Sequence, residues 1–406
     1  MTTATLDKPT LSAQPASPPP SDISAPRQPA AKTKIVLVGF DFGTNKSCLL
    51  AGSAGSTDIA VSKVIPTVVG YVKDGIVDGI IAGNARVLFG EDALRARLHV
   101  KMVAPLREGI IADPDVARDF LKQVRALADP SGTAEIRAVI GMPANAGETA
   151  RDDVRRCAQG IFDRVLMIPE PFLAALGYRE DSRVGQPNYV DPVTNSLFID
   201  IGGGTSDLCL VQGVFPSRDD QVSIPFAGDA IDQLMQEELD RTYPNNGLTR
   251  LRVREIKETH AYVGPSRKPL DVKVILSGKA HQLELGDVIG RACNTLVDKI
   301  YPALTTLIAR ASSDSVVTLL QNIVVTGGGS QIRGLDTVLQ QRLIADGYEA
   351  PKVKLAGHDF QRYVAIGALK ASRAARENQW QVLLDCRKVS AGPPGPPSSP
   401  AQLAAG

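Results

Sequence analysis

The chain has 406 residues, which is long for one compact domain and comfortable for two, at roughly 150 residues per domain. Its 45 Lys and Arg residues balance 44 Asp and Glu residues, and this balance argues against a partner nucleic acid bound through bulk positive charge. No stretch combines the length and apolarity of a membrane span. The five cysteines are scattered, without a Cys-x-x-Cys pair, so we expect reduced thiols and a cytoplasmic protein with no membrane insertion.

Proline is concentrated at the two ends of the chain. Residues 1–32 hold 7 of the 28 prolines and residues 391–406 hold 5. These ends contain few side chains that could pack, so we predict a disordered proline-rich tail at residues 1–33 and a second disordered tail at 391–406. The first tail lacks the continuous apolar stretch of a signal peptide, and export is therefore not expected.

Between the tails, short apolar runs alternate with helical patterns. In chain order, strands are predicted at residues 35–40, 47–51, 138–140, 165–168, 196–201, 208–211 and 323–325. Helices are predicted at residues 148–162, from about Pro171, and after the glycine turn at 327–329 through Ile344. The mixture of parallel αβ units and hairpins indicates an α/β protein whose sheets each include an antiparallel pair.

The same acidic, glycine-rich turn occurs twice, each time between two apolar strands. Residues 41–44 read Asp-Phe-Gly-Thr and residues 200–205 read Asp-Ile-Gly-Gly-Gly-Thr, 159 positions further along (200 − 41 = 159). Such a repeat in a two-domain chain suggests a duplicated unit whose two copies face a shared cleft.

These turns have the chemistry of a phosphate site. Glycine lets successive main-chain N–H groups approach an anion, and the Thr hydroxyls add donors. An aspartate in such a turn would repel phosphate unless a cation lay between them, so Asp41 and Asp200 together suggest Mg²⁺ held largely through its waters. One such turn alone is more often an ordinary hairpin, but the pair favours a clamp on one nucleotide. A P-loop sequence is absent.

Two further features have both a structural and a functional interpretation. The glycine turn at residues 327–329 could pass beneath a flat base and ribose, or could simply connect a strand to a helix. Glu170 lies between two prolines at a strand end. It could orient a hydrolytic water, although charge compensation at a helix N-terminus explains it better from the local sequence alone.

In this order, the two acidic turns and the glycine turn at residues 326–330 resemble the two phosphate motifs and the adenosine motif of the actin ATPase superfamily. The resemblance extends over residues 34–380. Its other elements are the two connecting segments (136–143 and 363–371), the small outer subdomain of actins (89–93 and 105–111) and the actin helix that borders adenine and ribose (253–258, with 262–263).

Within the superfamily, residues 169–172, 227–228 and 320–335 resemble the magnetosome actins of magnetotactic bacteria. The long proline-rich start departs from the short start of that group. The resemblance implies an actin-like α/β fold with two duplicated RNase H-like domains, each carrying a smaller inserted subdomain, and a nucleotide cleft between them. The implied parts are a first core (34–70, 113–192 and 361–390) with its insert (71–112), and a second core (193–228 and 287–360) with its insert (229–286).

The resemblance also implies a site for ATP or ADP with Mg²⁺. Asp41 and Asp200 would organise the metal, while Glu170, which aligns the attacking water in the family, would act with Asp200 in catalysis. Lys46 could reach a phosphate, or could be a solvated hairpin lysine. The implied nucleotide-binding residues are Gly43, Thr44, Asn45, Gly202, Gly203, Gly204, Thr205, Lys257, Glu258, Gly327, Gly328 and Gly329.

The implied function is a cytoskeletal ATPase that polymerises with itself and positions magnetosomes through an adaptor protein on the vesicle surface. A cell-shape or plasmid-segregating actin is the first alternative. A small-molecule kinase on the same fold would need a catalytic aspartate facing its substrate, where this chain offers the actin-like small subdomain. A chaperone-type ATPase would need a peptide-binding domain, but only 76 residues follow the adenosine motif (406 − 330 = 76).

Overall fold

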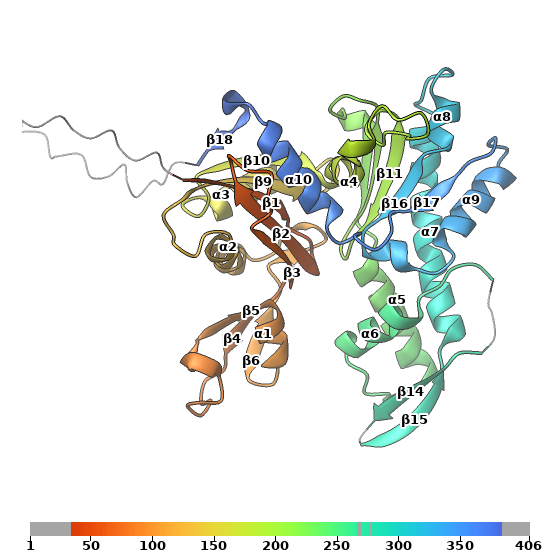
Figure 1. The fold of residues 1–406 in the computed structure, drawn as a ribbon. Coiled ribbons are helices and arrows are strands. Elements are labelled where there is room, and N and C mark those ends of the chain that lie inside the picture. Colours follow the sequence, from red (N-terminus) through yellow and green to blue (C-terminus); the bar gives the residue numbers. More distant parts are fainter. Residues whose placement is uncertain (1–33, 266–268, 277, 384–406) are drawn as a thin grey trace, which may run out of the picture. The chain divides into compact units, whose positions relative to one another are not determined.

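The computed structural model describes residues 34–265, 269–276 and 278–383, and the two predicted tails lie outside this part of the chain. Two mixed sheets form its centre (Figure 1). The first sheet has the order β18-β10-β9-β1-β2-β3 and the second has the order β13-β12-β11-β16-β17. The strands of the first sheet are β1 (Ile35–Asp41), β2 (Lys46–Ser53), β3 (Val61–Pro66), β9 (Glu135–Met142), β10 (Arg164–Pro169) and β18 (Gln381–Val382). Those of the second are β11 (Ser196–Ile201), β12 (Ser206–Val211), β13 (Gln221–Ile224), β16 (Ile323–Thr326) and β17 (Val353–Leu355).

The two sheets share one topology. In the first, β1, β2 and β3 form an antiparallel meander, and β9 and β10 then add in parallel on the other side of β1. In the second, β11, β12 and β13 form the meander, and β16 and β17 add in parallel beside β11. Asp41 and Asp200 lie at equivalent ends of β1 and β11, so the predicted duplication is confirmed by the pairing pattern.

Each sheet has its own apolar core. Helices α2 (Pro114–Ala128) and α3 (Glu148–Ala158) pack on the first sheet, where the stacked rings of Phe42 and Phe120 are buried. The second core joins its sheet to α5 (Gly228–Thr242), α6 (Arg250–His260), α7 (Gly286–Ile308), α8 (Val316–Leu320) and α9 (Leu335–Ala345). No helix of the described residues is long and apolar enough to cross a membrane.

Smaller elements occupy the regions predicted for the two inserted subdomains. Strands β4 (Val69–Val72), β5 (Val87–Phe89) and β6 (Val100–Val103) form a three-stranded sheet beside η1 (Ala82–Asn84) and α1 (Gly90–Arg95). The hairpins β7 (Leu106–Arg107) to β8 (Ile110–Ile111) and β14 (Asp271–Leu276) to β15 (Lys279–Glu284) are separate two-stranded sheets. The remaining short turns are η2 (Asp181–Arg183), η3 (Arg218–Asp220), η4 (Gly328–Gln331) and η5 (Glu377–Gln379). The described residues cluster as one compact unit, and the boundaries of the four subdomains stay a prediction.

Two helices, α4 (Glu170–Tyr178) and α10 (Tyr363–Ala374), contribute to a third apolar core together with residues of both sheets, including Val139 and Phe198. The backbones of the two helices are in direct contact where they cross, because each helix has a glycine that faces the other helix. A Cβ atom on Gly177 would lie 1.9 Å from the carbonyl oxygen of Tyr363, and one on Gly367 would lie 1.9 Å from that of Leu173. This crossing joins the two sheets through packed backbone.

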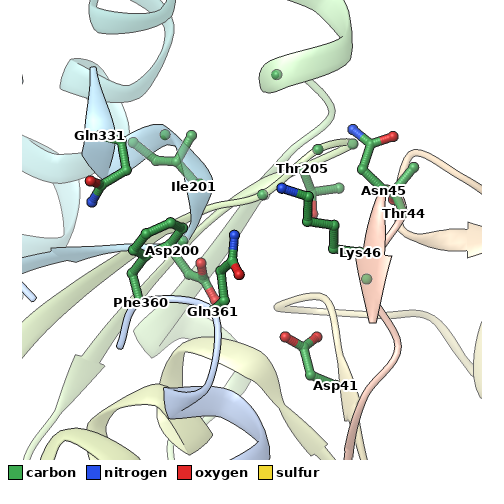
Figure 2. A pocket seen from close by; sticks show the side chains of 18 of the residues that line it. Asp41, Thr44, Asn45, Lys46, Asp200, Ile201, Thr205, Gln331, Phe360 and Gln361 are labelled. Atoms are coloured by element: carbon green, nitrogen blue, oxygen red, sulfur yellow. The ribbon is translucent and has the colours of Figure 1, made fainter. Parts of the chain in front are cut away.

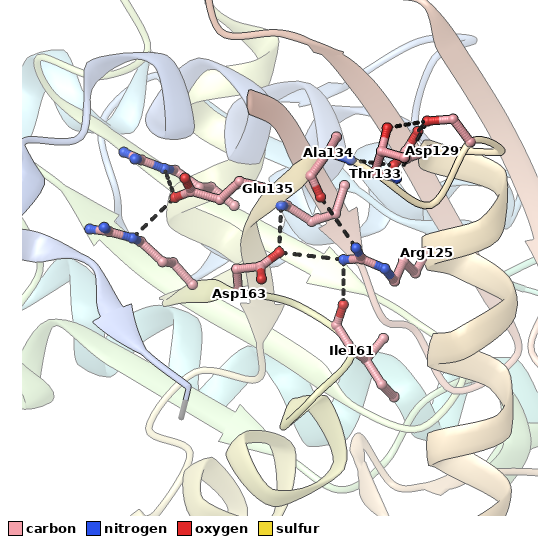
Figure 3. Close-up of polar contacts among 11 residues, drawn as sticks. Arg125, Asp129, Thr133, Ala134, Glu135, Ile161 and Asp163 are labelled. Carbon is pink, nitrogen blue, oxygen red and sulfur yellow. Dashed lines mark hydrogen bonds and ion pairs between the residues drawn. The ribbon is translucent and has the colours of Figure 1, made fainter. Parts of the chain in front are cut away.

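Polar contacts fix the start of the central strand β9 (Figure 3). The guanidinium of Arg125 on α2 donates to the carbonyl oxygens of Ile161 (2.7 Å) and Ala134 (3.2 Å). The carboxylate of Asp163 accepts from the backbone N–H of Ile136 at 2.7 Å. Because β9 lies between β1 and β10, these contacts set the register of the sheet at the end opposite Asp41.

All seven predicted strands are present, with ends that differ by a few residues. Two predicted helices are shorter than expected. The helix predicted at 148–162 ends at Ala158, because Gln159 is already extended. The helix predicted after the glycine turn begins at Leu335, because Gly334 adopts a left-handed conformation (φ 82°) between η4 and α9.

The α4–α10 crossing should tolerate no side chain at its centre. We expect Gly367→Ala to lower the free energy of unfolding by about 3 kcal/mol, since the new methyl group must displace backbone. Urea unfolding followed by circular dichroism measures this. Gly55→Ala is the control, because a Cβ there would meet nothing within 4 Å. Equal effects of the two substitutions would contradict the close crossing.

Candidate nucleotide site

Every residue predicted for the site lines one pocket with a cavity of about 310 Å³. The walls include the two acidic turns, the glycine turn at 327–329, residues of α6 and the first residues of three helices, α4, α5 and α10. Asp41 and Asp200 enter it from the two sheets (Figure 2). Helix N-termini carry partial positive charge, so this convergence favours an anionic ligand.

Four carboxylates line the inner part of the pocket: Asp41, Glu170, Asp200 and Asp207. Burial raises the pKa of Asp41 to about 7 and that of Asp207 to about 6. Burial, followed by repulsion from Asp41 and Asp207, also raises the pKa of both Glu170 and Asp200. Asp41, Glu170 and Asp200 have no hydrogen-bond or ion-pair partner among the described residues. Their charges are therefore uncompensated, and a cation would stabilise them.

These residues fit a Mg²⁺ ion held mainly through waters and phosphate. The described residues contain no group of three or more His, Cys, Asp or Glu side chains that could hold a metal ion by themselves. Mg²⁺ usually keeps several waters and takes only one or two carboxylates together with substrate phosphates. Asp41 and Asp200, unpaired and raised in pKa, supply carboxylates of this kind.

Asp207 differs from the other three carboxylates because it is hydrogen-bonded. It accepts from the Thr205 hydroxyl (2.6 Å) and from the backbone N–H of Ala144 (2.8 Å), which follows β9 in the first sheet. The Asp207 carboxylate therefore connects the second acidic turn to the first sheet. The sequence analysis did not select it, although it stands seven positions after Asp200, where β12 pairs with β11.

The two acidic turns touch each other directly. A Cβ on Gly204 would lie 2.6 Å from the Thr44 hydroxyl oxygen, and one on Gly203 would lie 2.2 Å from the amide nitrogen of Asn45. Only glycine permits this approach. The backbone N–H groups of Thr44, Gly203 and Gly204 have no hydrogen-bond partner among the described residues, so they are available to phosphate oxygens.

The threonine hydroxyls of the turns already have partners. Thr44 accepts a hydrogen bond from the backbone N–H of Gly109 at 3.0 Å, and its own proton stays free to be donated. Thr205 donates its proton to Asp207, as above. Within this arrangement, the Thr44 hydroxyl is a better phosphate donor than that of Thr205.

Lys257 and Glu258, predicted to border ribose and base, lie on α6 and line the pocket. The Lys257 ammonium donates to the carbonyl oxygen of Gly228 (2.6 Å) and pairs with Asp232 (2.6 Å), whose side chain is fully buried. Arg254, one turn earlier, pairs with the same aspartate at 2.9 Å. This ion-pair network fixes the position of α6 beside the pocket.

The glycine turn lies directly on the second acidic turn. Gly327 has φ 76°, and a Cβ there would lie 2.3 Å from a carboxylate oxygen of Asp200. A Cβ on Gly329 would lie 2.2 Å from the Ile201 side chain, whereas one on Gly328 would meet nothing within 4 Å. The turn therefore presents an open backbone surface at Gly328, as a site for a flat group requires.

Several pocket residues were not predicted as site residues, and for Lys46 the sequence left both a phosphate contact and a solvated hairpin position open. Lys46 and Gln361 extend into the pocket (Figure 2), and Phe360 and Gln331 also line it. Phe360 and Gln361 precede α10 and have no local motif, so only the fold brings them here. The position of Lys46, two residues after Thr44, was the available signal.

A family model described as MreB/Mbl protein matches residues 38–376, which is most of the chain. The chain belongs to the MreB/Mbl family. These are bacterial actins, and the fold is actin-like as the motifs predicted: two RNase H-like sheets of the same topology with smaller elements inserted in each half.

Proteins of similar sequence include the actin-like protein MamK of Paramagnetospirillum magneticum (strain AMB-1). It is 29% identical over 318 residues, which cover 77% of this chain and 86% of MamK. The solved MamK double helical filament matches with a TM-score of 0.74 at 27% identity, covering 84% of this chain and 100% of that one. A non-polymerising MamK mutant bound to AMPPNP matches with a TM-score of 0.59 at 27% identity, covering 84% and 99%.

The Asp41 carboxyl should make the stability of the ligand-free protein depend on pH. Its pKa is about 7 in the folded chain against an ordinary 3.8, so the folded chain retains a proton that the unfolded chain releases. This contribution to stability is complete below about pH 4 and is lost as the pH rises to about 7. Asp41→Asn should therefore stabilise the protein more at pH 8 than at pH 5.

Urea unfolding of both proteins at the two pH values, without nucleotide or metal, measures the difference. Asp74→Asn, at an exposed aspartate between β4 and β5, is the control. Parallel pH profiles for Asp41→Asn and the parent would show that Asp41 carries no raised pKa.

Proposed function

We propose that this chain is an ATP-dependent, filament-forming bacterial actin whose filaments turn over through ATP hydrolysis. The observation that carries this proposal is the meeting of both acidic turns and the glycine turn in one pocket, with uncompensated carboxylates beneath unpaired backbone amides. This arrangement suits a triphosphate with Mg²⁺ between two clamping turns, and a base and ribose over Gly328.

The proposed roles follow from position. The N–H groups of Thr44, Gly203 and Gly204 would bind phosphate oxygens, and Lys46 would add a positive charge beside them. Mg²⁺, when bound through Asp41 and Asp200, would neutralise charge on the phosphates. Glu170, at the start of α4 with a raised pKa, would accept a hydrogen bond from the attacking water and orient it. Phosphoryl transfer needs little beyond such positioning and charge stabilisation.

Self-assembly is proposed from the similarity to the MamK double helical filament, which this chain matches over the whole of that subunit. A head-to-tail contact whose rotation does not close generates an open helical polymer. ATP would favour assembly by binding the polymerised conformation more tightly, and hydrolysis would remove that preference.

The cellular role we propose is to organise and position magnetosomes from the cytoplasm, through an adaptor protein on the vesicle surface. The identity to MamK, 29% over 318 residues, supports this role. A cell-shape or plasmid-segregating actin is the second candidate, and the match of residues 38–376 to the MreB/Mbl model favours it over a small-molecule kinase.

Polymerisation is the direct test of the proposal. We expect the purified protein at micromolar concentration to sediment with ATP and Mg²⁺, to stay in the supernatant with EDTA, and to appear as filaments by electron microscopy. A chain that binds ATP but stays soluble under all these conditions would favour the kinase alternative instead.

Glu170→Ala should separate hydrolysis from assembly. We expect phosphate release to fall about 100-fold, because the water loses its orienting carboxylate. ATP affinity should change little, and filaments should form and persist. The measurement is phosphate release during assembly, with Glu377→Ala, on the exposed η5 turn, as control. Hydrolysis by Glu170→Ala at the parent rate would remove Glu170 from the mechanism.

A further inference from the structure

A single side-chain hydrogen bond joins the first acidic turn to α5, across the pocket rim. The amide nitrogen of Asn45 donates to a carboxylate oxygen of Asp229 at 2.8 Å. Asn45 belongs to the β1–β2 turn of the first sheet, and Asp229 is the second residue of α5, which packs on the second sheet. The two residues are 184 positions apart in sequence. The bond is therefore a contact between the two halves of the duplicated fold.

Asp229 is held rigidly on its own side. Its backbone N–H donates to the carbonyl oxygen of Gly203 in the second acidic turn at 2.7 Å. Its carboxylate pairs with Arg254 at 2.7 Å, and Arg254 also binds the fully buried Asp232. Lys257 completes the network by pairing with Asp232. Two cations and two carboxylates pair in this network, so the acceptor oxygen of Asp229 is held in position.

Asn45 and Asp229 differ in their relation to the pocket. Asn45 lines it, with its amide nitrogen packed over Gly203, whereas Asp229 does not line it. The hydrogen bond therefore lies at the rim, above the turns that would hold the phosphates. Any movement that parts the two turns must break it.

We propose that Asp229 is a positioning residue that holds the first acidic turn against the second through Asn45, and so sets the rate at which bound nucleotide leaves. The proposal rests on the proposed nucleotide site. It gives Asn45 a role through its side chain that differs from direct phosphate binding. Other contacts still join the halves, including that of Ala144 with Asp207. Loss of the Asn45–Asp229 bond would therefore loosen the rim without separating the two sheets.

A double-mutant cycle tests this inference. Release of a fluorescent N-methylanthraniloyl-ADP, chased with excess unlabelled ATP, is measured for the parent, Asn45→Ala, Asp229→Ala and the double variant. A hydrogen bond to a charged group is worth enough to change a rate about tenfold, so each single variant should release ADP about tenfold faster. The double variant should be no faster than either single one, because both remove the same bond.

The controls distinguish failure of the proposed nucleotide binding from failure of the role inferred for Asp229. Affinity of the parent for the labelled ADP tests the proposed function by itself, since no binding would end that proposal. Arg252→Ala, which removes an exposed ion pair with Glu255 on α6, should leave release unchanged. The inference is wrong if the effects of the two single variants multiply in the double variant, or if neither variant changes the rate of ADP release. In either case the parent binds nucleotide, but the Asn45–Asp229 hydrogen bond does not set the rate of release. Thermal unfolding of each variant identifies any loss that is merely structural.

Discussion

The close crossing of α4 and α10 is the contact on which the site depends. Gly177 and Gly367 let the two helices meet at backbone distance, and their apolar faces share a core with strands of both sheets. The same two helices begin at the pocket, where α4 supplies Glu170 and the residues just before α10 supply Gln361. The crossing that joins the halves therefore also places Glu170 and Gln361 in the pocket, and a shift in the crossing would move both.

Three carboxylates of the pocket have no positively charged partner among the described residues. Asp41, Glu170 and Asp200 line one pocket without partners among the described residues. Burial raises the pKa of all three carboxyls, and repulsion from neighbouring carboxylates raises it further for Glu170 and Asp200. Such a cluster destabilises the ligand-free fold near neutral pH, and a bound cation with its phosphates would relieve that repulsion. Ligand binding and stability are thus linked through the same carboxylates, and binding should favour the conformation in which both turns contact the ligand.

Local sequence was sufficient for seven of the strands, because each is a short apolar run, but it did not predict other strands such as β3 and β17. It also identified the duplication, since the turn at Asp41 recurs at Asp200. It could not place residues without a motif. Phe360 reaches the pocket only because the α4–α10 crossing brings the start of α10 there, and the role of Asp207 depends on a backbone N–H of the other sheet. The helix after the glycine turn began late because the left-handed turn at Gly334 intervenes.

The contacts between the halves fall into two physical classes. At α4 and α10 they are apolar and tightly packed, so separation would create a cavity at a cost of several kcal/mol. Around the pocket they are polar: Asn45 to Asp229, Ala144 to Asp207, and the Asn145 amide to the carbonyl oxygen of Gln221. Loss of such a bond to water has a net cost of about 1 kcal/mol for a carbonyl acceptor and about 1.5 to 3 kcal/mol for a carboxylate acceptor. A molecule built in this way should keep its crossing and open at its rim, which is the motion that nucleotide exchange needs.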